Sequence, residues 1–262
     1  MDVLERIVAA KKHDLEREKE AIPPRRIIEL ASGAPPPQDF AAALRRRERV
    51  NIIAEVKRAS PSRGGIREAA DPAAVARSYG AAGAAAISVL TEARYFLGAP
   101  EHLTAARESV QVPVLRKDFL FDEYQVYQSR ALGADSLLLI ARILGLKELT
   151  TLIGVARSLH MEPLVEVHGE EEVDRAVQAG AGVIGVNNRD LGTLAVSIEN
   201  SLRLIPRLPD SVVRVSESGI ETHADIERLR AAGFDAFLVG ERLMREDDPG
   251  AALRALLGAG ET

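Results

Sequence analysis

The sequence contains no cysteine among its 262 residues. This absence excludes disulfide bonds, a thiolate nucleophile, and zinc or iron–sulfur sites that depend on cysteine ligands. Any chemistry in this chain must therefore use carboxylates, amines, hydroxyls, imidazoles or backbone groups.

The sequence also lacks an excess of positive charge and any long apolar run. The formal net charge is -5, which argues against a basic surface for nucleic acid. No apolar stretch approaches the roughly 18 residues of a membrane span, and the N-terminus is too charged for a signal peptide. We therefore expect a cytoplasmic protein that binds neither nucleic acid nor membrane. We also expect a monomer, because no long exposed apolar face stands out.

Lysine is scarce, with six lysines among 34 basic residues. Because arginine is so common in this chain, a lysine in an apolar, strand-like segment is a better candidate for a functional residue than an arginine at the same place. Two of the six, Lys57 and Lys117, lie at the ends of strand-like apolar segments.

Eight such apolar segments alternate with amphipathic segments. This alternation implies a parallel sheet with helical crossovers. Eight units favour a closed (β/α)8 TIM barrel over the alternative, an open doubly wound sheet. Glycines after several helices, as helix C-caps, support the boundaries: Gly80 or Gly83, Gly133, Gly180 and Gly233. The predicted strands are 50–56, 84–90, 112–115, 135–140, 162–167, 182–187, 211–215 and 235–239. The predicted helices are 72–82, 100–109, 123–132, 147–159, 170–179, 198–205, 223–232 and 249–257.

The N-terminal segment carries no strand pattern. Residues 2–20 and 40–49 are predicted helices, separated by the prolines at 23–24 and 35–37. We expect a single domain over residues 1–262, in which residues 1–48 form an N-terminal helical extension and residues 49–262 form the barrel.

The first predicted strand breaks the rule that buried strands are apolar. In VNIIAEVKRASPS, residues 50–62, Glu55 and Lys57 are spaced two apart and point to the same face. Burying a carboxylate and an ammonium together costs several kcal/mol unless they are paired or used. The two charges therefore indicate a functional site. The alternative is that Glu55 and Lys57 form an ion pair in the barrel interior that takes no part in a reaction.

Polar residues follow most of the other strands, and in this fold the active site lies at the C-terminal strand ends. Gly219 and Gly240 follow the last two strands, where such barrels bind phosphate through backbone N–H groups. Lys57 and Ser60 reach the same region from the first strand, which neighbours the last when the barrel closes. We therefore expect a small phosphorylated substrate.

Lys117 and Glu166, at the ends of the third and fifth strands, are predicted to face one cavity. A lysine–carboxylate pair suits proton transfer, because burial and neighbouring charges tune each pKa. The alternative for Lys117 is a structural ion pair with Asp118, and His168 is interpreted as a loop histidine. Apolar side chains are predicted to form a pocket for a ring-bearing substrate: Leu90, Phe96, Phe119, Leu138, Leu191 and Leu194.

The glycines from Gly180 to Gly185 match G-x-G-x-x-G. A dinucleotide fingerprint follows a strand and opens a helix, whereas these glycines follow a helix and lead into a strand. We therefore predict no cofactor and no metal.

Seven ordered motifs resemble those of the indole-3-glycerol phosphate synthase family: IIAEVKRASPS, ISVLTEARYFLG, PVLRKDFL, EPLVEVH, IGVNNRDL, VSESGI and LVGERLM. The resemblance covers about residues 50 to 245, and the N-terminal extension is similar too. It implies ring closure of 1-(2-carboxyphenylamino)-1-deoxyribulose 5-phosphate to indole-3-glycerol phosphate, CO2 and water in tryptophan biosynthesis, a carboxy-lyase reaction without a cofactor.

The resemblance also implies roles for individual residues. Lys117 would be the general acid at the substrate carbonyl, and Glu166 its acid–base partner. Lys57 would hold the substrate carboxylate and share in the proton transfers, while Glu55 and Asn187 would orient the hydroxyls and the dehydration step.

The implied binding residues form three groups. Arg189 would contact the carboxylate or a hydroxyl, and Ser218 the polyol chain. The phosphate pocket would comprise Ser60, Gly219, Gly240 and, through its backbone N–H, Glu241. The ring would stack on Leu90, Phe96 and Phe119. Arg242 departs from the family pattern, which has a small residue at that position.

Two other functions fit parts of the pattern. A phosphoribosylanthranilate isomerase would keep the glycines but typically uses a cysteine and an aspartate, and this chain has no cysteine. A non-catalytic phosphate-binding or scaffold protein would lose Lys57, Lys117 or Glu166, and all three are present.

Overall fold

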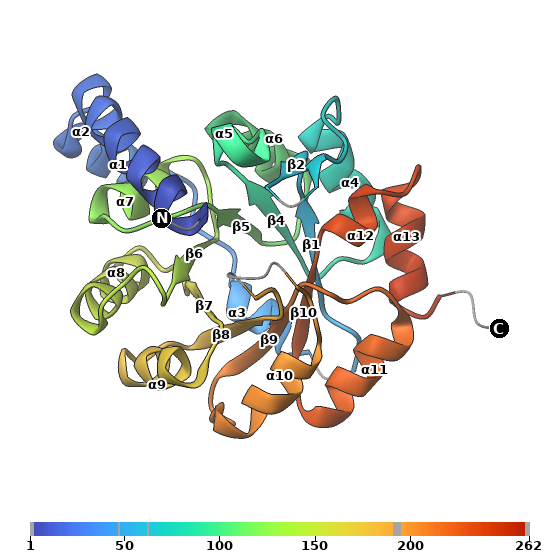
Figure 1. The fold of residues 1–262 in the computed structure, drawn as a ribbon. Helices are drawn as coiled ribbons and strands as arrows, with labels where there is room; N and C mark the ends of the chain where they lie inside the picture. The colour runs from blue at the N-terminus through green and yellow to red at the C-terminus, as the bar shows by residue number, and fades with distance from the viewer. Residues whose placement is uncertain (1–2, 47, 62, 191–194, 260–262) are drawn as a thin grey trace.

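The computed structural model describes residues 3–46, 48–61, 63–190 and 195–259. In these residues eight parallel strands close into a barrel in the order β1-β10-β9-β8-β7-β6-β5-β4, and helices surround it (Figure 1). The barrel strands are β1 (Ile52–Val56), β4 (Ala86–Leu90), β5 (Val114–Lys117), β6 (Ser136–Ile140), β7 (Leu164–Val167), β8 (Val183–Asn187), β9 (Val213–Glu217) and β10 (Ala236–Val239). The predicted (β/α)8 fold is confirmed, and the open sheet is excluded.

The helices that follow barrel strands lie close to their predicted positions. They are α4 (Pro72–Ala82), α6 (Pro100–Ser109), α7 (Glu123–Ala131), α8 (Leu146–Ser158), α9 (Glu170–Gln178), α10 (Glu199–Leu204) with the 3₁₀ turn η1 (Ile205–Arg207), α11 (His223–Ala232) and α13 (Pro249–Leu256). Gly83, Gly133, Gly180 and Gly233 all have positive φ, whereas Gly80 lies inside α4. Of the two candidate caps, Gly83 therefore ends α4.

Two strand predictions ended too early. The third and seventh strands were expected to stop at residues 115 and 215, but β5 and β9 continue through Lys117 and Glu217. Their last residues remain in register with neighbouring strands, where Leu90 pairs with Lys117 and Asn187 with Glu217. Pairing with β4 extends β5 to Lys117, and pairing with both β8 and β10 extends β9 to Glu217.

Several short elements were not predicted. They are α2 (Pro24–Gly33), α5 (Ala93–Phe96), α12 (Glu241–Met244) and the hairpin of β2 (Ala59–Ser60) and β3 (Gly64–Gly65). Helix α1 ends at Ala21, before the two prolines, and Pro24 occupies the first turn of α2, a position where the missing N–H costs nothing. The strand hairpin is too short to leave an alternating pattern.

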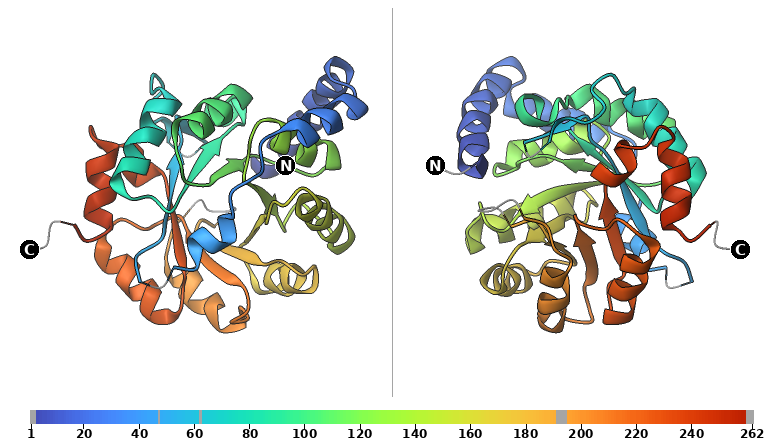
Figure 2. Two further views of the ribbon diagram at one scale, coloured as in Figure 1. Left: turned by 180° about the vertical axis from the view of Figure 1, so that it is seen from behind. Right: turned by 45° about the vertical axis from the view of Figure 1, so that its right-hand side comes forward.

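The N-terminal segment contributes three helices, α1 (Val3–Ala21), α2 and α3 (Phe40–Leu44). Helices α1 and α2 lie beside α7 on the outside of the barrel (Figures 1 and 2). The predicted helix 40–49 is too long, because the buried amide of Asn51 donates to the carbonyl oxygens of Leu44 and Arg46 and ends α3 early. Phe40 and Leu44 close the bottom of the barrel interior with Ile53, Leu115 and Val213.

Candidate active site

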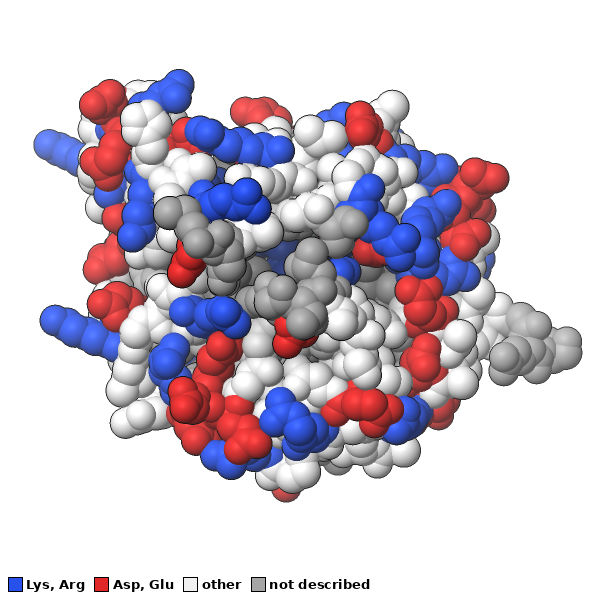
Figure 3. All heavy atoms as spheres, in the orientation of Figure 1, with Lys and Arg blue, Asp and Glu red and all other residues white. Residues whose placement is uncertain are grey.

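A cavity of about 580 Å³ opens at the C-terminal ends of the barrel strands. All of the predicted site residues line it: Glu55, Lys57, Ser60, Leu90, Phe96, Lys117, Phe119, Glu166, Asn187, Arg189, Ser218, Gly219, Gly240 and Glu241. Leu138 also lines it, whereas Leu191 and Leu194 lie outside the described residues. Figure 3 views this end of the molecule, with Lys and Arg side chains around the central hollow. The volume is typical of a small-molecule site.

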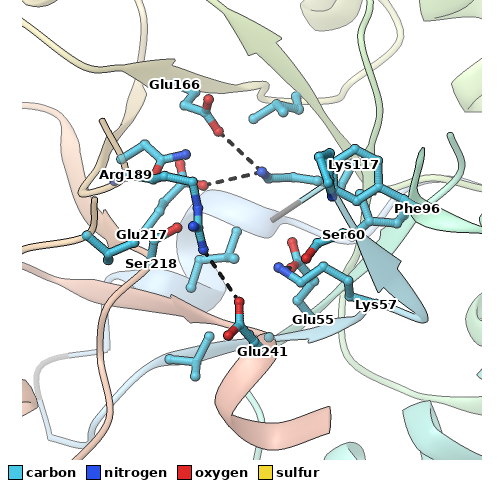
Figure 4. Close-up of a pocket in the computed structure, with 18 of the residues that line it drawn as sticks. Glu55, Lys57, Ser60, Phe96, Lys117, Glu166, Arg189, Glu217, Ser218 and Glu241 are labelled. Atoms are coloured by element: carbon cyan, nitrogen blue, oxygen red, sulfur yellow. Dashed lines mark hydrogen bonds and ion pairs between the residues drawn. The ribbon is translucent and has the colours of Figure 1, made fainter. Parts of the chain in front are cut away.

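The ammonium group of Lys117 lies between two carboxylates from other strands (Figure 4). Its Nζ atom is 3.2 Å from Oε2 of Glu166 on β7 and 3.6 Å from Oε2 of Glu217 on β9. All three side chains are largely buried. The predicted Lys117–Glu166 pair therefore forms, with a second carboxyl group beside it.

The two carboxyl groups next to Lys117 have opposite pKa shifts. Burial raises the pKa of Glu166, but the positive charges of Lys117 and His168 and a hydrogen bond from Asn187 outweigh it, and the net pKa is lowered. Burial also raises the pKa of Glu217, and repulsion from Glu166 adds to this, so that the pKa rises to about 8 despite Lys117. The surroundings therefore favour the ionised form of Glu166 and shift Glu217 toward its protonated form.

The pKa of Lys117 itself is raised. Burial would lower it, but the carboxylates of Glu166, Glu217 and Glu55 more than offset the desolvation. Lys117 is therefore held in its charged form next to the carboxylate of Glu166. Pairs of titratable groups whose environments push their pKa values apart are typical of acid–base sites.

Glu217 was not among the predicted site residues, although a signal for it exists. Along β9, Val213 and Val215 face the barrel interior, and a strand alternates its faces with period two. Glu217 therefore continues the inward face. Its two carboxyl oxygens are buried and make no hydrogen bond within the described residues, and Oε2 lies 3.6 Å from the ammonium group of Lys117.

Gly185 on β8 provides the space that Glu217 occupies. A Cβ atom at residue 185 would overlap Oε1 of Glu217 and lie 3.0 Å from its Cδ atom. We expect Gly185→Ala to displace the Glu217 carboxyl group and to reduce kcat by roughly tenfold or more, with a smaller effect on stability. Steady-state kinetics with a thermal melt measures both, and Gly154→Ala, where a Cβ atom meets nothing within 4 Å, is the control. Unchanged kcat in Gly185→Ala would show that the position of Glu217 is unimportant.

Glu55 and Lys57 form the ion pair that their spacing predicted, with 2.7 Å between Oε1 and Nζ. Burial raises the pKa of Glu55, but the charges of Lys57 and Lys117 outweigh it and lower the net pKa. Gly240 on the adjacent loop approaches closely, since a Cβ atom there would overlap the Glu55 carboxyl group. The pair forms one wall of the cavity opposite Glu166 (Figure 4).

Glu241 faces the cavity with its side chain. Its carboxylate is 2.9 Å from Nε of Arg63 and 3.4 Å from Nη2 of Arg189. It therefore links the loops that follow β1, β8 and β10. Arg242, the departure from the family pattern, also lines the cavity and forms ion pairs with Glu221 and Glu246.

The loop after β9 is held in an uncommon conformation. Ser218 and Gly219 both have positive φ, 69° and 76°, which for a serine costs of order 1–3 kcal/mol. The buried Asn188 side chain donates to the Ser218 carbonyl oxygen and to Ser216, and so holds the loop in place. A Cβ atom at residue 219 would lie 2.6 Å from Val196, so glycine is required there.

The apolar wall combines barrel loops with the N-terminal helix. The rings of Phe96 and Phe119 are tilted, with centroids 6.1 Å apart. Helix α1 supplies Val3, Leu4 and Ile7 to the same cavity. The extension is therefore part of the site, which the sequence left undetermined.

Helix α1 is attached through Asp118, the residue after Lys117. The buried Asp118 Oδ2 atom accepts from Lys11 at 2.8 Å, from Thr91 at 2.6 Å and from Arg116 at 3.1 Å. Asp118 is thus paired with Lys11 and Arg116, whereas Lys117 is paired with Glu166 and Glu217. The alternative of a Lys117–Asp118 ion pair is wrong, because the two side chains alternate to opposite faces of the chain.

Two other sequence features, His168 and the glycines 180–185, do not form part of this cavity. His168 does not line it, although its Nε2 atom is 3.5 Å from Oε1 of Glu166. The glycines 180–185 lead into β8, as the sequence indicated. Within the described ranges there is no cluster of three potential metal ligands and no helix long and apolar enough to cross a membrane.

Comparison with known proteins decides the family. The sequence profile described as indole-3-glycerol phosphate synthase matches residues 4–256. The chain belongs to the indole-3-glycerol phosphate synthase family. The enzyme of that name from Carboxydothermus hydrogenoformans is 48% identical over 97% of this chain and 99% of its own length. The one from Chromobacterium violaceum is 46% identical over 98% of each chain.

Solved structures show a similar fold at low sequence identity. The 3-hexulose-6-phosphate synthase from Salmonella typhimurium superposes with a TM-score of 0.65 at 15% identity, covering 80% of this chain and 98% of that one. This likeness concerns the fold alone.

The family match confirms the resemblance read from the motifs, the predicted synthase function and the predicted class, a carboxy-lyase. A phosphorylated small-molecule substrate is consistent with that family.

Proposed function

We propose that this chain performs the ring closure with Lys117, Glu166 and Glu217 as its proton-transfer groups. The observation that carries the proposal is the Lys117 ammonium, placed within 3.6 Å of two carboxyl groups with opposite pKa shifts. The substrate is 1-(2-carboxyphenylamino)-1-deoxyribulose 5-phosphate, and the products are indole-3-glycerol phosphate, CO2 and water.

The cavity offers a separate surface to each part of this substrate. The aromatic ring fits against Phe96, Phe119 and Leu90, with α1 on the outer side. The phosphate fits near Ser60, Gly219 and Gly240, and the backbone N–H of Glu241, where loops 7 and 8 of such barrels bind phosphate.

Two cations are available for the substrate carboxylate, Lys57 and Arg189. Both are held by acids in the structure, Lys57 by Glu55 and Arg189 by Glu241. Substrate binding would exchange part of this pairing for contacts with the carboxylate. Ser218 faces the polyol chain.

Ring closure needs one proton at the substrate ketone oxygen. As the ring carbon that bears the carboxylate attacks the ketone carbon, Lys117 donates that proton and the oxygen becomes a hydroxyl group. The bond to the carboxylate then breaks, CO2 leaves, and its electron pair restores the aromatic ring. Glu166, ionised and next to Lys117, stabilises the donor and takes part in its reprotonation.

Dehydration needs an acid and a base together. The hydroxyl group leaves as water after accepting a proton, for which the protonated Glu217 is positioned. The ionised Glu166 removes a proton from the neighbouring methylene carbon, and the indole double bond forms. Glu55 and Asn187 orient the hydroxyl groups. Exclusion of water by the apolar wall strengthens each of these interactions.

The direct test is activity of the purified protein. With the carboxyphenylamino substrate, we expect an increase in indole fluorescence that depends on enzyme concentration, without added metal or cofactor. Phosphoribosyl anthranilate, offered separately, should not be isomerised. Absence of the fluorescent product would overturn the proposal, and isomerisation would favour the alternative function.

The proposal also concerns the state of the protein in the cell. We infer a cytoplasmic monomer that acts on a phosphorylated small molecule and requires neither nucleic acid nor membrane. A mass near 28.3 kDa in light scattering is the expected result, and a stable dimer would contradict it.

A further inference from the structure

A second cavity lies at the opposite end of the barrel. It has a volume of about 340 Å³ and is lined by Leu44, Arg45, Arg46, Arg49, Asn51, Arg214, Arg230, Gly233, Phe234 and Asp235. Asn51 and Asp235 immediately precede β1 and β10, and Arg214 is near the start of β9, so the cavity lies at the N-terminal strand ends. This is the end where α3 closes the barrel (Figure 2, left), away from the proposed chemistry.

The lining is strongly positive. Among the described residues, it contains five arginines and one acid, Asp235. The Asp235 carboxylate accepts from the backbone N–H of Arg214 at 2.8 Å and lies 3.7 Å from Nε of the same residue. That Nε atom is buried and makes no hydrogen bond within the described residues. The single acid of the lining is therefore committed to β9 and leaves a positive excess.

The other acids near these arginines, among the described residues, are exposed, and they include Glu48 next to Arg49. Asp210, the partner of Arg214 Nη1, is 97% exposed, and Glu227, the partner of Arg230, is 51% exposed. Exposed ion pairs of this kind contribute little to stability, because water screens them. A polyanion that entered the cavity would replace them at small cost.

The positive wall is held in place by a buried amide. Asn51 donates to the carbonyl oxygens of Leu44, Arg46 and Asp235 at 2.9 to 3.0 Å. Its own Oδ1 atom accepts from Nε of Arg49 at 3.2 Å. One side chain thereby links the loop after α3 to the start of β10, and the backbone that carries Arg46 and Arg49 is positioned before any ligand binds.

The guanidinium groups also repel one another. Burial, and then the charge of Arg46, lowers the pKa of Arg49, and the smaller opposing effect of Glu48 does not offset them. Bringing several arginines around one cavity costs free energy in the absence of a counter-charge. The barrel fold does not explain this arrangement, and neither does the reaction at the other end.

We propose that this second cavity binds a small polyanion with two adjacent phosphate groups. Arginine forks match phosphate oxygens in a bidentate manner, and arginines from three segments surround the cavity: the loop after α3, β9 and α11. A cavity of this volume admits a pyrophosphate group with a small substituent. The site is independent of the proposed function, because none of the described residues lines both this cavity and the active-site cavity.

The test uses inorganic pyrophosphate in isothermal titration calorimetry at low salt, without divalent cations. The wild type should show a saturable component that persists in Lys57→Ala, a variant in the other cavity. Arg46→Gln/Arg230→Gln should weaken this component by about tenfold or more. Both replaced side chains are exposed, so the fold should survive, which circular dichroism checks.

The matched control is Arg25→Gln/Arg77→Gln, which changes the net charge equally at two exposed positions outside the cavity. It should bind pyrophosphate like the wild type. Equal weakening in both double variants, or no component that survives Lys57→Ala, would overturn the proposal. Tighter binding of citrate than of pyrophosphate would refute the assignment to phosphate groups.

Discussion

Replacing Lys117 by methionine is expected to reduce kcat by roughly 10³-fold or more while substrate binding largely survives. A general acid contributes typically 10²–10⁴-fold, and Lys117 is the ammonium held between Glu166 and Glu217 in the cavity. Methionine retains the apolar stem but removes the proton donor. Single-turnover measurements of indole fluorescence give the rate, and equilibrium binding of substrate gives Kd.

The matched control is Lys147→Met, at an exposed position on α8. It should leave both quantities unchanged. Lys117→Met also leaves two buried carboxyl groups without their cation, so circular dichroism must establish that the variant is folded. A folded Lys117→Met variant with near-normal kcat would disprove the role of Lys117 as the acid.

The second large effect concerns Glu217. We expect Glu217→Gln to lower kcat by about 10²-fold and to change the pH dependence. The pKa of Glu217 is raised to about 8, so the wild type should lose activity as the pH rises through that value and the carboxyl group gives up its proton. Glutamine cannot titrate, and the residual activity of the variant should lack this alkaline decline.

Stability provides an independent measure of the same group. Between the pKa of an unfolded glutamate, about 4.3, and about 8, the folded protein holds a proton that the unfolded chain releases. The contribution of Glu217 to the free energy of unfolding therefore falls as pH rises through this window. Glu217→Gln should remove that contribution in urea titrations at several pH values. An unaltered activity profile together with an unaltered stability profile would show that Glu217 is ionised throughout.

Glu217 shows which kind of site residue could not be predicted from the sequence alone. Lys117 and Glu166 were predicted because each is a charge at the end of an apolar strand. Glu217 stands in the same setting, but within Ser216-Glu217-Ser218 it did not stand out from its polar neighbours. Its role depends on its distance from Lys117, which lies 100 positions earlier in the chain. The pairing exists only once the barrel closes.

The N-terminal segment shows a second limit. Its helical character was predicted from periodicity, but the length of α3 and the existence of α2 were not. Asn51 ends α3 through hydrogen bonds that no local pattern reveals. Helix α1 is held at the cavity by long-range contacts such as the Lys11–Asp118 pair, whose members are 107 residues apart in the sequence.

The sequence by itself determined the barrel, the order of its strands and many of the residues that line the active-site cavity, but not Glu217 or the residues of α1. These follow from short-range patterns, since apolar periodicity sets each element and parallel strands bring their C-terminal ends together. The tertiary structure decided which charges pair, which carboxyl group holds a proton and where α1 lies. Those properties depend on burial and on distances between segments that are far apart in the chain. An ion pair between such segments leaves no repeating pattern in the sequence from which it could be predicted.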